Sequence, residues 1–209
     1  MSLALALKTA TSDAHKIAES KPFQRETLSG TINLNILGQY FIQLHEIHCA
    51  LETHFANQSS IGELIEWNKS FCHSSNLEED IEKLKIQTTP TVFECTRALI
   101  KKIDQSIANE PLSLLGYFYV LEGSMNGNRF IVRAVRSKNS QTDCAFSYFD
   151  PYGEDQPANW ARFKTNLEKI SVDPSKEALI IESALEMFNG ISMISDEVMQ
   201  QSLVSLSDS

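Results

Sequence analysis

Apolar residues recur along this chain at the spacing of an α-helix, and no segment shows the convincing alternation of a β-strand. The longest seam recurs every three or four residues, through Leu37, Phe41, Leu44, His48, Leu51 and Phe55. Asn33 stands shortly before it, and asparagine is favoured at the position that caps a helix N-terminus. Helices with one apolar face bury that face against each other when no sheet is available. The sequence therefore predicts an all-α fold.

Prolines and the same periodicity divide the chain into about seven or eight helices. In the first helix an apolar stripe runs through Leu3, Leu7, Ala10, Ala14 and Ile17, and Pro22 lies a few residues beyond its expected end. Further helices are expected at residues 61–66 and 77–84, from Pro90 to about residue 107, from Pro111 onward, and after Pro157 and Pro174. We expect a single domain over residues 1–209, with about residues 198–209 as a flexible polar tail.

The composition is that of a folded, acidic protein. Hydrophobic residues make up 42% of the 209 residues, and the formal charge of −9 argues against a nucleic-acid partner, which requires a basic surface. The four cysteines are widely spaced and form no CxxC pair, so free thiols are expected. Lys8 interrupts the apolar N-terminus, and no stretch approaches the roughly 20 apolar residues that span a bilayer. We therefore expect a cytoplasmic protein without a membrane partner.

Polar residues form a second stripe on the first predicted helix. Lys8, Ser12, His15 and Glu19 recur at intervals of three or four residues, so they share one face at the margin of the apolar stripe. His15 and Glu19 are one turn apart, which lets the carboxylate orient the imidazole and makes the ring a better metal ligand. A solvated helix face with a chance histidine explains the same pattern, and the stripe alone favours that simpler interpretation.

Three glycines mark the helix that begins near Pro111. Gly116, Gly123 and Gly127 fall on one helical face, although each interior glycine costs a helix roughly 1 kcal/mol relative to alanine. A face without Cβ atoms lets a flat ligand lie against the backbone. The alternative is close helix–helix packing through a glycine groove, which one glycine pair by itself favours. Together with His15, the glycines would form the two sides of a site for a planar macrocycle with a central iron.

The other histidines carry weaker signals. His45, His48 and His54 do not converge with a set of carboxylates, so we expect them at core or surface positions. His73 follows Cys72 in a predicted loop, with nothing in the sequence to pair with it.

Two motifs of the chain resemble those of heme oxygenases. The run Ala14-His15-Lys16-Ile17-Ala18-Glu19 is similar to the proximal-helix signature of that family, His-x-x-Ala-Glu. The run Tyr119-Val120-Leu121-Glu122-Gly123-Ser124, followed by Gly127, resembles the distal-helix signature of its bacterial members. The segment from Phe149 to Gly153, with Trp160 and Phe163, resembles the part that precedes their last helices. The resemblance implies a heme oxygenase-like domain that opens heme with O2 and electrons, giving biliverdin, ferrous iron and carbon monoxide.

The resemblance also implies roles for single residues. His15 would ligate the heme iron, and Glu19 would hold the other nitrogen of its ring. Gly123 and Gly127 would lie over the distal face of heme, and Ser124 stands where mammalian relatives have an aspartate that organises water. An electron donor such as a ferredoxin or a flavoprotein reductase would be the protein partner. The candidates for binding the heme propionates are Lys8, Tyr119, Arg162 and Lys164.

The chain also departs from the family pattern. Asn126, Asn128 and Ser12 stand where leucine, glycine and lysine are usual. Two rival functions therefore stay open: a heme-binding carrier of the same fold that has lost turnover, and a thiamin-degrading hydrolase of the same architecture. The hydrolase needs a nucleophilic cysteine near an acidic residue, and Cys49 and Cys95 lie on predicted helices without a recognisable motif. Fold alone does not decide between these functions.

Overall fold

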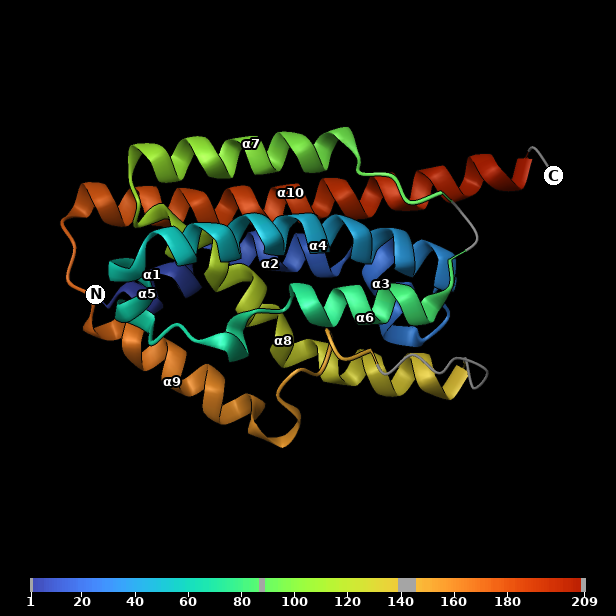
Figure 1. Cartoon of the computed structure of the whole chain (residues 1–209), viewed down its shortest axis with the longest axis horizontal. Coiled ribbons are helices and arrows are strands. Elements are labelled where there is room, and N and C mark those ends of the chain that lie inside the picture. The colour runs from blue at the N-terminus through green and yellow to red at the C-terminus, as the bar shows by residue number, and fades with distance from the viewer. Residues whose placement is uncertain (1, 87–88, 139–145, 208–209) are drawn as a thin grey trace.

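The computed structural model of the chain describes residues 2–86, 89–138 and 146–207. In this part the fold consists of ten α-helices and two short 3-10 helices, without a strand (Figure 1). The all-α prediction is confirmed, and the helices outnumber the seven or eight expected. They are α1 Leu3–Ala10, α2 Ser12–Glu19, α3 Pro22–Ser29, α4 Leu34–Asn57, α5 Ser59–Ile65, η1 Lys69–Phe71, α6 Ser74–Leu84, α7 Glu94–Asn109, α8 Ser113–Lys138, η2 Gly153–Asp155, α9 Gln156–Lys169 and α10 Pro174–Ser207.

The N-terminal segment supplies two of the unexpected helices. The single helix predicted there is divided at Thr11 into α1 and α2, and the Thr11 hydroxyl donates a hydrogen bond to the Leu7 carbonyl at 2.8 Å. Pro22 lies beyond the end of α2 at Glu19, as expected, and it also opens α3, because proline fits the first turn of a helix. Leu3 and Leu7 are buried, whereas Ala10 is exposed and Ile17 is 60% exposed, so the predicted apolar stripe is buried only in the first part of α1.

The long helix α4 follows its sequence prediction closely. All six residues of its apolar seam are buried. The Asn33 side chain accepts a hydrogen bond from the Asn35 N–H at 2.8 Å, which satisfies one of the unpaired donors at the helix N-terminus. The cap and the period of the seam together determine where α4 begins and which face enters the core.

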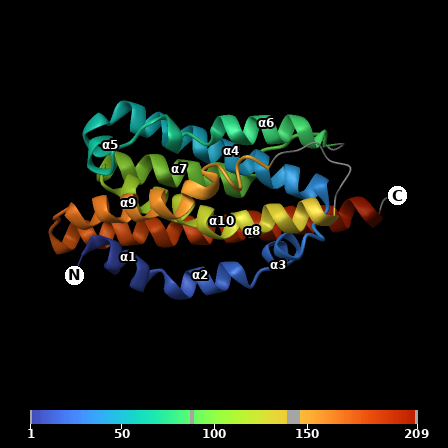
Figure 2. The ribbon, with the colours of Figure 1, turned by 90° about the horizontal axis from the view of Figure 1, so that it is seen from below.

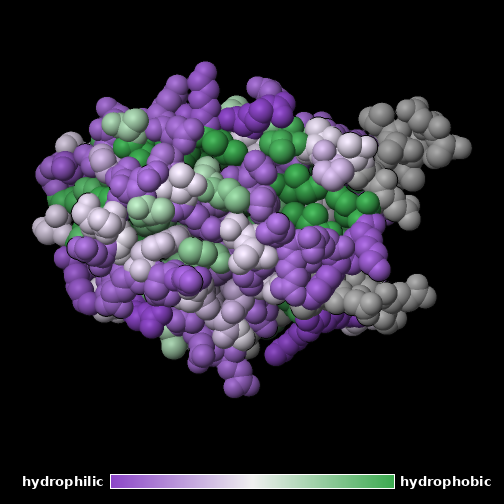
Figure 3. All heavy atoms as spheres, in the orientation of Figure 1, coloured by the Kyte–Doolittle hydropathy of each residue, from purple (hydrophilic) through white to green (hydrophobic). Residues whose placement is uncertain are grey.

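The last helix, α10, lies at the centre of the bundle. It packs against α8, α7 and α4 and also contacts the three N-terminal helices (Figures 1 and 2). By length and composition residues 174–201 could span a membrane, which was not expected from the sequence. Of its most apolar stretch 39% is buried inside the bundle, and the core helix of a folded domain can be equally long and apolar. Polar side chains dominate the face of the molecule in Figure 3, with smaller apolar patches between them.

Other predicted boundaries shift by a few residues. The helices expected at 61–66 and 77–84 are α5 and α6, and α7 begins at Glu94 rather than at Pro90. Residues 198–207, expected as a polar tail, continue α10, and Val198 is buried because that helix still packs on the bundle. Residues 208–209 of the expected tail lie outside the described residues.

Candidate functional site

His15 lies on α2 beside the carboxylate that the sequence pairs with it. Its Nδ1 atom is 3.3 Å from Oε2 of Glu19, and the two side chains are 56% and 63% exposed. The Phe188 ring of α10 packs edge-on to the imidazole, with 5.7 Å between ring centroids. Because Nδ1 faces Glu19, Nε2 is the ring nitrogen that can bind a metal brought from solvent.

The junction between α1 and α2 contacts the glycine-bearing helix α8. Tyr119 of α8 is half-buried, and its hydroxyl lies close to the side chain of Thr11. Burial raises the pKa of Tyr119, and the nearby Thr11 side chain offsets part of that rise. Lys8, on the last turn of α1, and Ser12, at the start of α2, are exposed close to this contact in the sequence. The residue that precedes α2 therefore lies close to α8, the other helix that carries a sequence motif.

The three glycines of α8 lie in three different surroundings. A Cβ atom on Gly116 would be 2.0 Å from the carbonyl oxygen of Ile180, so this glycine serves the close packing of α8 on α10. A Cβ atom on Gly123 would be 3.3 Å from the ring of Trp160. A Cβ atom on Gly127 would meet nothing within 4 Å. The shared face inferred from the sequence is therefore a packing groove at one end and an open surface at the other.

Polar side chains between and after the distal glycines bond to α8 itself. The Ser124 hydroxyl donates to the Leu121 carbonyl at 2.6 Å, and the Asn126 amide donates to the Gly123 carbonyl at 2.9 Å. Asn128 contacts the sulfur of Met125 at 3.7 Å. Side-chain bonds to helix carbonyls compete with the backbone ladder and bend helices. Figure 1 shows that α8 changes direction along its length.

Helix α9 contributes an aromatic wall beside Gly123. Trp160 packs against Tyr119 with 5.6 Å between ring centroids, and the Lys164 ammonium lies 5.6 Å from the centre of the Trp160 ring. The Arg162 guanidinium instead donates to the Asn159 side chain at 2.9 Å. Of the two α9 residues expected near a propionate, the structure brings Lys164 to the wall and bonds Arg162 within its own helix.

Sequence reasoning missed a buried polar cluster behind α8. Glu122 and His73 are 0% and 1% exposed, and His73 Nε2 lies 3.4 Å from Glu122 Oε2. The Tyr152 hydroxyl donates to the same oxygen at 3.1 Å and lies 3.2 Å from His73 Nε2. The expectation that His73 has no partner is therefore wrong, because the fold places its loop against α8. One signal was present: Glu122 is a carboxylate inside an apolar run.

A second buried histidine lies next to this cluster. His48 is 1% exposed, and its Nε2 lies 3.1 Å from the Tyr148 hydroxyl. Burial lowers the pKa of His48 well below its usual value, and the nearby His73 and His45 lower it further. His48 is thus a neutral core histidine, as its place on the α4 seam predicts.

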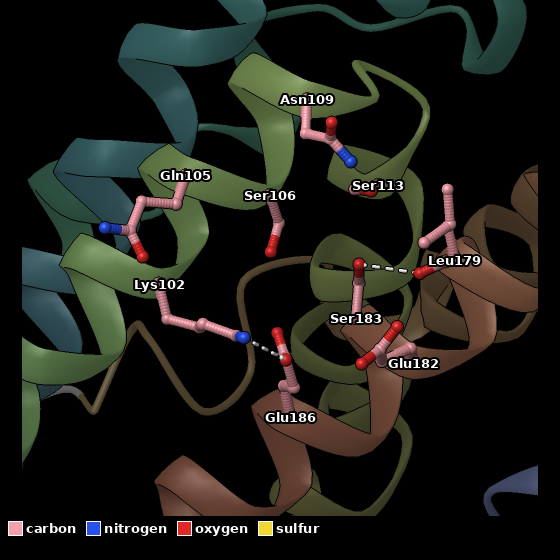
Figure 4. Close-up of a pocket in the computed structure, with 9 residues that line it drawn as sticks. All are labelled: Lys102, Gln105, Ser106, Asn109, Ser113, Leu179, Glu182, Ser183 and Glu186. Atoms are coloured by element: carbon pink, nitrogen blue, oxygen red, sulfur yellow. Dashed lines mark hydrogen bonds and ion pairs between the residues drawn. The ribbon is translucent and has the colours of Figure 1, made fainter.

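Two cavities are described, and none of the predicted site residues lines either of them. The first measures about 220 Å³ and lies where α7, α10 and the start of α8 meet (Figure 4). Its walls are polar, with the Lys102 ammonium 3.1 Å from a Glu186 carboxylate oxygen. The second, about 490 Å³, is an open groove beside Cys95 and Met193. His15, with its side chain 56% exposed, lies on the surface outside both of these cavities.

Comparison with known proteins points to one family. The heme oxygenase family model matches residues 1–196. A heme oxygenase of Xanthomonas campestris is 33% identical over 102 residues, which cover 47% of this chain and 61% of that protein, less than two thirds of its length. A heme oxygenase of Guillardia theta is 26% identical over 197 residues, covering 90% of this chain and 82% of that protein.

Solved structures share the fold at low sequence identity. The heme oxygenase of Leptospira interrogans superposes with a TM-score of 0.85 at 20% identity, covering 94% of this chain and all of that chain. Heme oxygenase-1 of the cyanobacterium Synechocystis, solved in complex with heme, gives 0.86 at 16% identity over 100% and 99% of the two chains. A domain of unknown function from Shewanella denitrificans with a heme oxygenase-like fold gives 0.75 at 15% identity, over 100% and 97%. These structures identify the fold.

Proposed function

Since this chain belongs to the heme oxygenase family, we propose that it binds heme and opens the ring with O2 and electrons to biliverdin, ferrous iron and carbon monoxide. The observation that carries the proposal is the exposed His15–Glu19 pair on α2. Thr11, which precedes α2, lies close to Tyr119 of α8. The same helix α8 carries Gly127, where a Cβ atom would meet nothing within 4 Å. Heme fits this arrangement, because the iron of a porphyrin would need only one side chain from the protein, and His15 would supply it. Within the residues described, no three metal-ligating side chains gather into a site of their own.

His15 binds the iron through Nε2 in this proposal. Glu19 accepts a hydrogen bond from Nδ1–H of His15 at 3.3 Å, which selects the tautomer with its proton on Nδ1. The same bond makes Nε2 a stronger ligand. The exposure of His15 leaves room for a macrocycle to approach the ring.

Gly127 and Gly123 supply the distal side in this proposal. With no Cβ at Gly127, the backbone of α8 could lie close to a heme ring, and heme would supply the oxidative chemistry. The Ser124 hydroxyl already donates to the Leu121 carbonyl, so its contribution is to the bend of α8. Asn126 does the same at the Gly123 carbonyl, which makes this departure from the family motif compatible with activity.

Cationic and phenolic groups around the two helices hold the propionates in this proposal. Lys8 is exposed on α1, Tyr119 lies at the contact between the helices, and Lys164 lies over Trp160. Arg162 gives one of its five N–H groups to Asn159, and the others could reach a propionate. The reaction further requires O2 and an electron donor such as a ferredoxin or a flavoprotein reductase. We place this chemistry in the cytoplasm, in a single domain of residues 1–209.

The thiamin-hydrolase alternative requires a reactive thiolate. Cys95 lies on α7, where burial and a hydrogen bond to Glu197 raise its pKa to about 12. Burial and the nearby Glu52 also raise the pKa of Cys49. Both thiols stay protonated near neutral pH, which disfavours nucleophilic catalysis. Cys144 lies outside the described residues. The other alternative, a heme carrier without turnover, differs from the enzyme only in the fate of bound heme.

A hemin titration followed by a reductant under air tests the proposal. We expect a Soret band that appears on binding and decays to a verdin spectrum, with free iron and carbon monoxide as co-products. A Soret band that persists under these conditions would support the carrier and contradict the enzyme.

The His15→Ala variant tests the axial ligand. We expect heme still to bind through apolar contacts, with the ferric spectrum changed from imidazole-ligated to water-ligated and turnover reduced at least 100-fold. His54→Ala is the matched control, because His54 also pairs with a carboxylate, 2.7 Å from Asp104, on a different part of the surface. An unchanged ferric spectrum in His15→Ala would exclude His15 as the ligand.

A further inference from the structure

Glu122 immediately precedes Gly123 in α8, and its side chain is completely buried. A buried carboxylate is costly unless it is hydrogen-bonded. Its bonds come from two other segments of the chain: His73, which precedes α6, and Tyr152, which precedes η2 and α9. Glu122 Oε2 therefore joins α8 to the segments that precede two other helices, α6 and α9.

The proton positions in this cluster follow from its geometry. Tyr152 has a single hydroxyl proton and donates it to Glu122 Oε2. His73 Nε2 lies within 3.4 Å of that oxygen and 3.2 Å of the Tyr152 hydroxyl, so it bonds to either only when it carries a proton. Burial and the adjacent Glu122 raise the pKa of Tyr152, which keeps its hydroxyl proton in place. Glu122 Oε2 thus has two neighbours from other segments, whereas Glu122 Oε1 is buried without a hydrogen-bond partner among the described residues.

The same segment that carries Tyr152 also carries Trp160. Tyr152 precedes η2, η2 packs against α9, and α9 packs against α8. The Trp160 ring of α9 lies 3.3 Å from the point where a Cβ atom of Gly123 would be. The Glu122–Tyr152 bond and the Trp160–Gly123 contact therefore join α8 and the η2–α9 segment at two points, on neighbouring residues of α8.

We propose that Glu122, through Tyr152 and His73, is a positioning residue that determines how closely Trp160 lies over Gly123, and so sets the wall of the heme site on that side. The inference rests on the proposed function only in taking the Gly123–Gly127 surface as the side that faces heme. Glu122 itself touches neither heme nor O2. Tyr152 bonds to a carboxylate that belongs to α8, so a displacement of Tyr152 changes the distance between α8 and α9.

Fluorine NMR on the heme-free protein labelled with 5-fluorotryptophan tests the positioning directly. The chain has two tryptophans, and Trp67→Phe assigns the two resonances. Tyr152→Phe removes a single hydroxyl and is expected to shift the Trp160 resonance by more than its linewidth. Glu122→Gln keeps an oxygen that accepts from Tyr152, so a smaller shift is expected. Trp67, stacked on Phe55 at 3.9 Å between ring centroids, serves as the internal reference.

Tyr148→Phe is the matched control. It also removes one buried hydroxyl that bonds to a histidine, His48, but it does not touch Glu122. We expect it to lower thermal stability about as much as Tyr152→Phe while leaving the Trp160 resonance in place. A Trp160 resonance that is unmoved in Tyr152→Phe, or that Tyr148→Phe moves equally, would overturn the inference.

Heme dissociation into excess apomyoglobin provides the second measurement. We expect Tyr152→Phe to release heme at least threefold faster than the parent protein, and Tyr148→Phe to release it at the parent rate. A shifted Trp160 resonance with an unchanged dissociation rate would reduce Glu122 to a structural role and overturn the proposal. Failure of the parent protein to bind heme would instead refute the proposed function, and the NMR result on the heme-free protein would still decide the spacing.

Discussion

Two glycines on α8 that the helical period places on one face meet opposite surroundings. At Gly116 the backbone of α8 touches that of α10, and a Cβ atom would lie 2.0 Å from the Ile180 carbonyl oxygen. At Gly127 a Cβ atom would have nothing within 4 Å. The fold requires the first glycine and does not require the second.

This difference separates a packing role from a functional one. Each glycine costs a helix interior roughly 1 kcal/mol relative to alanine. At Gly116 close packing of two helices offsets that cost, as ordinary ridge-and-groove contacts do. At Gly127 no contact in the folded chain offsets it. The open end of the glycine face is therefore the part that favours a ligand.

Gly116→Ala should give the largest change in stability. The new methyl group meets backbone, which cannot rotate away, and overpacking of this kind costs about 1–3 kcal/mol. We expect a net loss near 2 kcal/mol and a fall in melting temperature of roughly 4–8 °C, measured by circular dichroism on the heme-free protein. An unchanged melting temperature would show that the α8–α10 contact adapts and would weaken the comparison.

Gly127→Leu should leave the fold intact and reduce turnover. The side chain enters space that is open in the folded chain, where the proposal places heme and O2. We expect heme to bind and verdin formation to slow at least tenfold, which corresponds to about 1.4 kcal/mol in the barrier. Ser137→Leu, at an exposed position in the last part of α8, is the control and should turn over at the parent rate. If Gly127→Leu turns over heme at the parent rate, the open surface at Gly127 takes no part in the reaction.

Gly127→Ala should have the opposite sign to Gly116→Ala. The added methyl group meets nothing within 4 Å, so only the gain in helix propensity remains. We expect the heme-free protein to be more stable by about 0.5–1 kcal/mol in urea unfolding. A destabilised variant would mean that Gly127 has a packing role after all.

Gly123→Ala should give the smallest change. A Cβ atom there would lie 3.3 Å from the Trp160 ring, so mild crowding opposes the gain in helix propensity. We expect a net effect within about 0.5 kcal/mol of zero, and a more favourable one when Trp160→Phe is present as well. A double-mutant cycle measured by urea unfolding gives the coupling. Strict additivity would show that Trp160 does not press on this position.

Much of the fold could be predicted because its signals are local. The α4 seam and the Asn33 cap depend on neighbours within a few residues, and both are present as expected. The one-turn spacing of His15 and Glu19 also brings their side chains together, at 3.3 Å. The division at Thr11 was missed, because a threonine hydroxyl that bonds to its own helix leaves no mark on the apolar period. The Gly30 that ends α3 with a positive φ of 74° was a readable signal for that helix.

By itself, the sequence determined the helical class, the main amphipathic faces and the His15–Glu19 pair, because each follows from the fixed geometry of a helix. Tertiary structure alone decided which glycine is packed and which is open, since that depends on where α10 and α9 lie. It also decided the partners of His73 and Glu122, which are 49 residues apart in the chain. Helical periodicity records which side a residue is on, whereas its neighbour on that side is set only when the helices pack.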